Sequence, residues 1–349
     1  MIRCYIGTAL ALLLVAGRGL SANLPPAMAA LPFNRLVPGA VTNASPVFLS
    51  EDTLALLLRS AARPGTSKIV LLRIANGQVQ VVAETDKTYE GDQVFSVSNG
   101  RLLIAGTRNK HLYSRDLHQK WELTMKVLSK QFPRTDIIGE GGPKGEKAFR
   151  LTTPPTPINR DTGDLLAVSD DTLVYEKEEE IRTATADGVT RGSIPITPGS
   201  RYFNHVELAG PGRLYFSAAG DEHITDFTGK MMVGVHPPNG WGGRHGWSGD
   251  GKRLLFDKYQ HNVPFGKRVA GAIADALGSV LPEQANAEVV RVIEVSTGAV
   301  CLNLESPDAL LGPAGGYHAD LSPSGGLAVV ATVADLTVYR LPTTCPTQR

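Results

Sequence analysis

The stretch Trp247-Ser-Gly-Asp-Gly-Lys-Arg-Leu-Leu-Phe256 decides the fold of this chain. It joins a tight turn, in which glycine tolerates positive φ, to a short apolar strand, and such turns between β-rich runs are typical of hairpins. The phrase recurs at 49–58, 97–104, 208–216 and 321–330, with a degenerate copy at 161–168. A turn-and-strand phrase repeated this often predicts an all-β protein built from copies of one unit.

The spacing of the copies selects the architecture. Gly210 and Gly249 lie 39 residues apart, close to the ~40–45 residues of a four-stranded propeller blade. Without the first 29 residues and one interruption, the chain holds about seven such blades. We therefore predict a seven-bladed β-propeller, with six blades and longer loops as the alternative. Closure of the ring is expected to pair a strand from residues 32–48 with the last blade.

Two copies of the phrase carry a family resemblance. Residues 248–256 and 322–329 resemble the S-P-D-G-x-x-hydrophobic signature of WD40-like and TolB-like propeller repeats of exported bacterial proteins. The Pro-Asp pair is intact in neither copy. The first copy keeps only the aspartate, Asp250, and the second keeps only the proline, Pro323. The resemblance implies a propeller. Proteins of this propeller superfamily include binding modules, peptidase gating domains and metal-dependent sugar lyases. The resemblance therefore implies function only broadly.

The first 29 residues predict a secretory signal peptide. Arg3 precedes an apolar run from Ile6 to Gly17, and twelve residues reach only ~18 Å, too short to span a bilayer. Ala27-Met28-Ala29 fits the small-x-small cleavage rule, with the stretch that ends at Ala22 as the alternative. No later stretch is long and apolar enough to cross a membrane. We expect residues 30–349 to form one exported domain, periplasmic or extracellular.

Composition and cysteine content indicate the class of protein and its disulfide bonding. The chain has 35 basic and 34 acidic residues and is 42% hydrophobic, which argues against intrinsic disorder and gives no electrostatic footprint for nucleic acid. Cys4 leaves with the signal peptide, so Cys301 and Cys345 remain as a pair in an oxidising compartment. One disulfide between them is expected, with two independent buried thiols as the alternative.

One irregular segment interrupts the β pattern. Residues 265–288 carry Val269, Ile273, Leu277 and Val280 at helical spacing, between two prolines. They predict a helical insertion that packs on its own propeller, or else forms a lid or a partner-binding face.

Three histidines form the one group of residues that could hold a metal ion or carry out chemistry. His205, His245 and His318 precede their second strands at nearly the same phase of three repeats, where a propeller chain enters its innermost strand beside the central channel. Imidazole with carboxylate suits Zn²⁺, Mn²⁺ or Ni²⁺. The surroundings of His245 and His318 also resemble the metal-binding histidines of oligogalacturonate-lyase propellers. Inherited structural hydrogen bonds, without metal, are the alternative. Further candidates at the channel mouth are Glu207, Arg244, Trp247 and Asp320.

Common catalytic signatures are missing: the sequence has no G-x-S-x-G, H-E-x-x-H, C-x-x-C or P-loop motif. We therefore expect a non-catalytic binding scaffold, without a cofactor, acting as a monomer on a protein or carbohydrate ligand at one face of the disc. The first alternative is a metal-dependent polysaccharide lyase or hydrolase that uses the three histidines. The second is a subunit of an envelope complex docked through residues 265–288.

Overall fold

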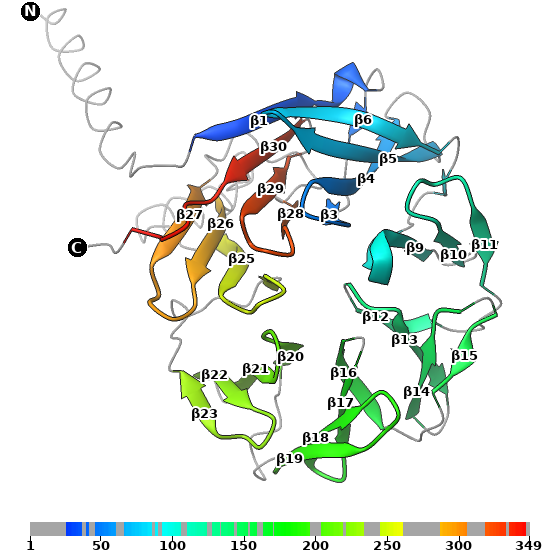
Figure 1. The fold of residues 1–349 in the computed structure, drawn as a ribbon, viewed down its shortest axis with the longest axis vertical. Helices are drawn as coiled ribbons and strands as arrows, with labels where there is room; N and C mark the ends of the chain where they lie inside the picture. The colour runs from blue at the N-terminus through cyan, green and yellow to red at the C-terminus, as the bar shows by residue number, and fades with distance from the viewer. Residues whose placement is uncertain are drawn as a thin grey trace, which may run out of the picture.

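The computed structural model describes residues 26–346, apart from 37–39, 42–45, 61–65, 86–87, 90–92, 106–109, 124–127, 133, 143–144, 153, 159–162, 170, 196–203, 219–220, 234–244, 261–286, 306–317 and 333–334. Seven antiparallel sheets stand around a central axis (Figure 1), and six of them have four strands. The predicted seven-bladed β-propeller is confirmed. Among the described residues the only helical segments are two 3₁₀ turns, η2 (Phe33–Arg35) and η3 (Ser98–Gly100).

The blades follow one another along the chain. Blade 1 holds β2 (Ala40–Val41), β3 (Val47–Phe48), β4 (Thr53–Ser60), β5 (Thr66–Ala75), β6 (Gln78–Glu84) and β7 (Thr88–Tyr89). Blade 2 holds β8 (Gln93–Val97), β9 (Arg101–Ala105), β10 (Lys110–Tyr113) and β11 (Lys120–Glu122). Blade 3 holds β12 (Leu128–Gln131), β13 (Ile137–Gly142), β14 (Gly145–Arg150) and β15 (Thr156–Pro157). Blade 4 holds β16 (Asp164–Val168), β17 (Thr172–Lys177), β18 (Glu180–Thr185) and β19 (Thr190–Pro195).

The last three blades include the stretch 247–256 that decided the fold and two of its copies. Blade 5 holds β20 (Asn204–Leu208), β21 (Arg213–Ala218), β22 (Asp221–Asp226) and β23 (Met231–Val233). Blade 6 holds β24 (His245–Trp247), β25 (Arg253–Gln260), β26 (Ala287–Glu294) and β27 (Val300–Glu305). Blade 7 holds β28 (His318–Leu321), β29 (Leu327–Ala331), β30 (Asp335–Arg340) and, from the other end of the chain, β1 (Ala27–Pro32).

The hydrophobic core is divided among the interfaces between blades. Seven clusters of buried side chains lie one at each contact between neighbouring blades, including the contact between blade 7 and blade 1. Middle strands are therefore covered on both faces, and all six residues from Thr53 to Leu58 are buried. This explains why the strands of the repeated phrase are continuous apolar runs and do not alternate between apolar and polar residues.

The ring is closed by a strand other than the expected one. β1 pairs antiparallel with β30 from Ala27 to Pro32, with a register shift at Met28, whereas β2 and β3, within the expected range 32–48, belong to blade 1. Closure by the N-terminus on the last blade is as predicted, but residues 27–32 provide it. Met28 and Leu31 of β1 pack against the core between blades 7 and 1, so the strand contributes apolar contact as well as hydrogen bonds.

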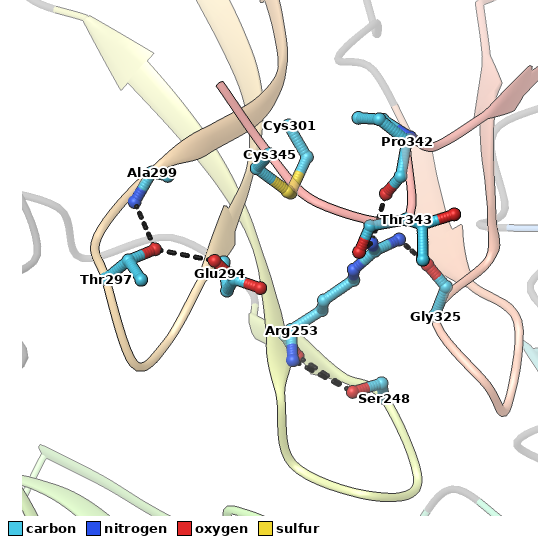
Figure 2. Close-up of a disulfide and its surroundings, with 10 residues drawn as sticks. All are labelled: Ser248, Arg253, Glu294, Thr297, Ala299, Cys301, Gly325, Pro342, Thr343 and Cys345. Atoms are coloured by element: carbon cyan, nitrogen blue, oxygen red, sulfur yellow. Dashed lines mark hydrogen bonds between the residues drawn. A yellow bond between two sulfur atoms is a disulfide. The ribbon is translucent and has the colours of Figure 1, made fainter. Parts of the chain in front are cut away.

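The tail after β30 is fastened to blade 6. Cys345 forms a disulfide with Cys301 of β27, with the two Cα atoms 4.7 Å apart, as predicted. The buried Arg253 of β25 donates hydrogen bonds to the carbonyls of Pro342 and Thr343, the latter at 3.3 Å, and to that of Gly325 at 2.6 Å (Figure 2). One covalent bond and one guanidinium thus hold the tail to the neighbouring blade.

Blade 4 contains a copy of the phrase that the sequence reading misplaced. Residues 161–168 overlap the innermost strand β16, whereas the turn and second strand are Val168-Ser-Asp-Asp-Thr-Leu-Val-Tyr175. That segment matches Leu49-Ser-Glu-Asp-Thr-Leu-Ala-Leu56 of blade 1. In both, a serine hydroxyl donates to an aspartate two residues on, Ser50 to Asp52 and Ser169 to Asp171, each at 2.9 Å. The prediction of a degenerate copy at 161–168 therefore lay one strand too early in the chain.

Candidate functional site

The two ends of the ring differ in how the chain crosses them. We call the end with the turns between innermost and second strands the turn face, and the end where the innermost strands of blades 5, 6 and 7 begin the histidine face. At the turn face these links are short: 209–212, 248–252 and 322–326. The segments that lead into β20, β24 and β28 are longer, spanning residues 196–203, 234–244 and 306–317, and lie outside the described residues. Long connections on a rigid scaffold are where propellers vary and bind.

The turn face is tied together from blade to blade. The Glu51 carboxylate accepts hydrogen bonds from the amide and hydroxyl of Ser324, both at 2.6 Å, which links blade 1 to blade 7. The Gly249 amide donates to the Pro323 carbonyl at 2.6 Å, linking blade 6 to blade 7. Gly251 has a φ of +68°, and a Cβ there would collide with the Ala209 carbonyl of blade 5. Glycine at 251 therefore permits both the turn and this close approach.

The three predicted histidines lie on neighbouring innermost strands. His245 and His318 begin β24 and β28, and His205 is the second residue of β20. Their main chains therefore stand at the histidine face, as the repeat phase predicted. His205 and His318 each stand three positions before the last residue of their strands, but His245 stands two before. The side chains of all three, and the whole of Arg244, lie outside the described residues. The metal site therefore stays a prediction.

Glu207 and Trp247 lie near the turn-face ends of β20 and β24 and bind one another. The Trp247 indole Nε1 donates a hydrogen bond to Glu207 Oε2 at 2.8 Å, joining blade 6 to blade 5. The indole also packs against the Tyr215 ring, with centroids 5.6 Å apart. Burial raises the pKa of Glu207 to about 7, and the indole hydrogen bond opposes that rise. The sequence placed both residues near the channel mouth, and the structure joins them as an inter-blade tie.

Asp320 occupies in β28 the position that Glu207 occupies in β20, one residue before the strand ends. Its Oδ2 accepts from the Phe48 amide of blade 1 at 2.7 Å, and its Oδ1 accepts from the Leu321 amide at 2.8 Å. The equivalent residue of blade 6 is Gly246, which lies next to Asp320: a Cβ there would stand at ordinary contact distance, 3.8 Å, from Oδ1. Asp320 thus ties the last blade to the first.

Arg134 completes this group from the opposite side of the ring. It lies in the turn between β12 and β13 of blade 3, with a φ of 60°, across the central opening from blades 6 and 7 (Figure 1). Its guanidinium donates to the Trp247 carbonyl at 3.0 Å, to the Leu321 carbonyl, and to Asp320 Oδ1 at 3.4 Å. We call Arg134, Asp320, Trp247 and Glu207 the cross-channel network.

The cross-channel network joins blades 1, 3, 5, 6 and 7. Burial raises the pKa of Asp320, while the Arg134 guanidinium and the amides of Phe48 and Leu321 oppose the rise. Sequence reasoning missed Arg134 because blade 3 carries no copy of the phrase, so nothing marked residue 134 as a turn beside the channel. Both described acids nominated for chemistry accept hydrogen bonds that hold blades together.

Metal-ligating side chains do not gather within the described part of the chain: no three His, Cys, Asp or Glu residues there form a group that could hold an ion. The helical insertion predicted at 265–288 falls almost wholly on 261–286, outside the described residues. The part of the chain that the structure covers contains no helix with the length and hydrophobicity needed to cross a bilayer.

Comparison with known proteins gives a fold likeness alone. No protein-family model matches the sequence. No curated protein matches it either. Among solved structures the chain is similar to one described as the AfRom2 CNH domain, with 8% sequence identity and a TM-score of 0.48. The alignment covers 87% of this chain and 96% of that one.

Proposed function

We propose that this chain is an exported, non-catalytic binding scaffold related to the WD40-like and TolB-like propellers. It takes a protein or carbohydrate ligand at the histidine face. The observation that carries the proposal is the cross-channel network, in which Glu207 and Asp320 serve as inter-blade ties. Acids engaged in this way hold a rigid ring, and a rigid ring presents loops in fixed relative positions.

The choice of face rests on the contrast between the two ends. The turn face has short links that contact one another through Glu51, Ser324 and Gly249, so these polar groups are committed to the fold. The long connections all lead into the histidine face. Ligand specificity is therefore assigned to the histidine face, with the turn face acting as its support.

Export is supported by the disulfide. Cys301 and Cys345 are both buried and bonded, and such cross-links persist in oxidising compartments but are rare in the cytosol. The expected location is the periplasm or the extracellular space.

The test of the binding face uses a pair of matched variants on a glycan array and in a protein-interaction screen. His245→Ala alters the histidine face, whereas Lys252→Ala alters an exposed residue of the turn face. We expect every ligand of the natural chain to lose at least tenfold in affinity with His245→Ala and to be unaffected by Lys252→Ala. Loss of affinity with Lys252→Ala alone would place the ligand at the other end of the ring.

A metal-dependent lyase or hydrolase is the second candidate, because three histidines stand near the starts of consecutive innermost strands. Metal content by elemental mass spectrometry, on protein purified without chelator, separates it from the scaffold. The scaffold proposal expects no stoichiometric Zn, Mn or Ni. Near-stoichiometric metal that falls in His318→Ala would favour the enzyme, and uronate polymers would then be the substrates to test.

A further inference from the structure

The chain that follows β30 lies in the seam between blades 6 and 7, and we call residues 341–346 the strap. Leu341 and Cys345 are buried in the apolar cluster that these two blades share. Of the other four residues of the strap, three are exposed, and none of the six belongs to a strand. Two side chains therefore seat the strap in the ring, and its backbone bonds decide how firmly it is held.

The backbone of the strap is held by separate hydrogen bonds and not by a strand ladder. The Leu341 amide donates to the Gly326 carbonyl of blade 7 at 2.9 Å. The Arg253 guanidinium of blade 6 donates to the Pro342 and Thr343 carbonyls, the latter at 3.3 Å (Figure 2). The ladder between β1 and β30 ends before the strap begins. The strap can therefore lift while the ring stays closed.

The disulfide is shielded as long as the strap is seated. Cys301 and Cys345 are each 4% exposed, and thiol–disulfide exchange requires a thiolate to reach one of the two sulfurs. Two motions would expose a sulfur: unfolding of the whole ring, or lifting of the strap alone. Opening a short segment held by few contacts costs less free energy than global unfolding. Lifting of the strap is therefore the favoured route to the disulfide.

Arg253 sets the free-energy cost of lifting the strap. Its side chain is buried, and its guanidinium also donates to the Gly325 carbonyl of blade 7 at 2.6 Å. A Cβ at Gly325 would stand 3.0 Å from Arg253 Cδ, so the stem of the side chain packs against that turn. When the strap lifts, the Pro342 and Thr343 carbonyls leave this fixed donor. Breaking hydrogen bonds to a charged group costs more than breaking neutral ones.

We propose that the strap is a redox-controlled fastening of blade 7 to blade 6, released by a local opening that Arg253 controls. Once the strap lifts, a thiolate of a dithiol reductant attacks Cys345 Sγ, and the Cys301 sulfur leaves as a thiolate. The second thiol of the reductant then displaces Cys345 from the mixed disulfide. The dithiol ends as a disulfide and the protein ends with two thiols, so two electrons and two protons pass to the protein. The strap thereby sets how firmly β24 and β28, which begin at His245 and His318, are held together.

The first test is the rate at which a dithiol reduces the full, disulfide-bonded chain, followed as free thiols by alkylation and intact mass. Below the unfolding transition the rate is expected to depend little on urea, because a local opening exposes little surface. Arg253→Met is expected to raise the rate about tenfold or more. Arg253→Lys keeps the charge with fewer donors and should raise it less, which keeps the test available if Arg253→Met does not fold. Lys252→Met, at the exposed neighbouring residue, should leave the rate unchanged.

A matched control separates local opening from a general loss of stability. Leu31 of β1 packs in the core between blades 7 and 1, away from the strap. Leu31→Ala should therefore lower the stability of the whole ring and leave the rate of reduction unchanged. If Leu31→Ala accelerates reduction as much as Arg253→Met does, the disulfide opens only through global unfolding and the proposal is wrong.

Hydrogen exchange shows what release of the strap does to the ring. In Cys301→Ala/Cys345→Ala the strap amides are expected to exchange at least about tenfold faster than in the natural chain, while those of β1 and β30 keep their protection. Equal protection of the strap in both chains would mean that the disulfide does not fasten it. Loss of protection at β1 and β30 would mean that the strap is required for ring closure. Either result would overturn the proposal.

Discussion

Blade 7 is fastened twice, once by each end of the chain, and the two fastenings differ in kind. At its outer edge β1 forms a ladder with β30 and carries apolar side chains into the seam with blade 1. On its other side the tail is held to blade 6 by the Cys301–Cys345 disulfide and by Arg253 (Figure 2). The first is extensive and indifferent to redox conditions; the second is local and depends on oxidation. The fold therefore requires β1, whereas the tail adds to a ring already closed.

Removal of β1 should have the largest effect. A chain that begins at Phe33 loses the whole ladder and the packing of Met28 and Leu31, leaving the seam between blades 7 and 1 open to water. We expect the melting temperature to fall by ~10 °C or more, or cooperative unfolding to be lost. Scanning calorimetry measures this, with a chain that begins at Asn23 as the control. Similar melting of the two chains would mean that β1 is dispensable.

Loss of the disulfide should have the next largest effect. Cys301 and Cys345 are 44 residues apart, and opening a loop of that length should lower the free energy of unfolding by about 2–4 kcal/mol. Urea unfolding of Cys345→Ala measures the loss. Reductant should bring the natural chain to the stability of the variant and leave the variant unchanged. A reductant effect on Cys345→Ala would point to a different cause.

Arg253 should contribute somewhat less and should act together with the disulfide. Arg253→Met leaves the carbonyls of Gly325 and Pro342 without the donor, so we expect about 2–3 kcal/mol of lost stability. Arg253→Lys keeps the charge and is the matched control, with a smaller loss. Because both devices hold one tail, Arg253→Met combined with Cys345→Ala should cost less than the sum of the two. Strict additivity would show that they hold the tail independently.

The effect expected from Glu207, a tie that touches neither fastening, is a dependence of stability on pH. Its raised pKa means that the folded chain holds this proton more tightly than the unfolded chain does. Its stabilising contribution is therefore complete below its ordinary pKa of 4.5 and is lost as the pH rises to about 7. Over that range Glu207→Gln should remove a slope of at most about 1.4 kcal/mol per pH unit.

The control for Glu207 is Trp247→Phe, which removes the donor that opposes the rise in the Glu207 pKa. It should move the pH-dependent loss of stability to higher pH. The slope that persists in Glu207→Gln belongs to other groups, including Asp320, whose raised pKa acts in the same direction. A profile identical to that of the natural chain in Glu207→Gln would contradict the assignment.

The fold could be predicted where the sequence repeats itself. Asp-Gly and Pro-x-Gly turns before apolar runs marked blades 5, 6 and 7, and their spacing gave the right number of blades. Blade 4 could have been read as well, because Val168–Tyr175 matches Leu49–Leu56 in the serine, aspartate and threonine of its turn. It was missed because Asp161-Thr-Gly-Asp164 looks like a turn of the same kind.

The site and the closure were harder to predict, for two different physical reasons. Arg134 makes contacts across the ring to residues more than a hundred positions away, and pairings of that sort leave no periodic mark in a sequence. β1 was hidden because Ala27-Met28-Ala29 satisfies two requirements at once: small residues suit a peptidase, and they also suit a closing strand in contact with two blades. Position along the innermost strands, by contrast, was predictable for the three histidines, since repeat phase fixes it.

The pairing of β1 with β30 has a consequence for the order of assembly. The residues of β1 leave a ribosome or a translocation pore about three hundred residues before their partners in β30. Such a contact is among the most non-local that a chain of this length can make, and non-local contacts form late. Blades 1 to 6 can hence stack while β1 waits unpaired, and the whole domain becomes protected from aggregation and proteolysis only when the final strand arrives.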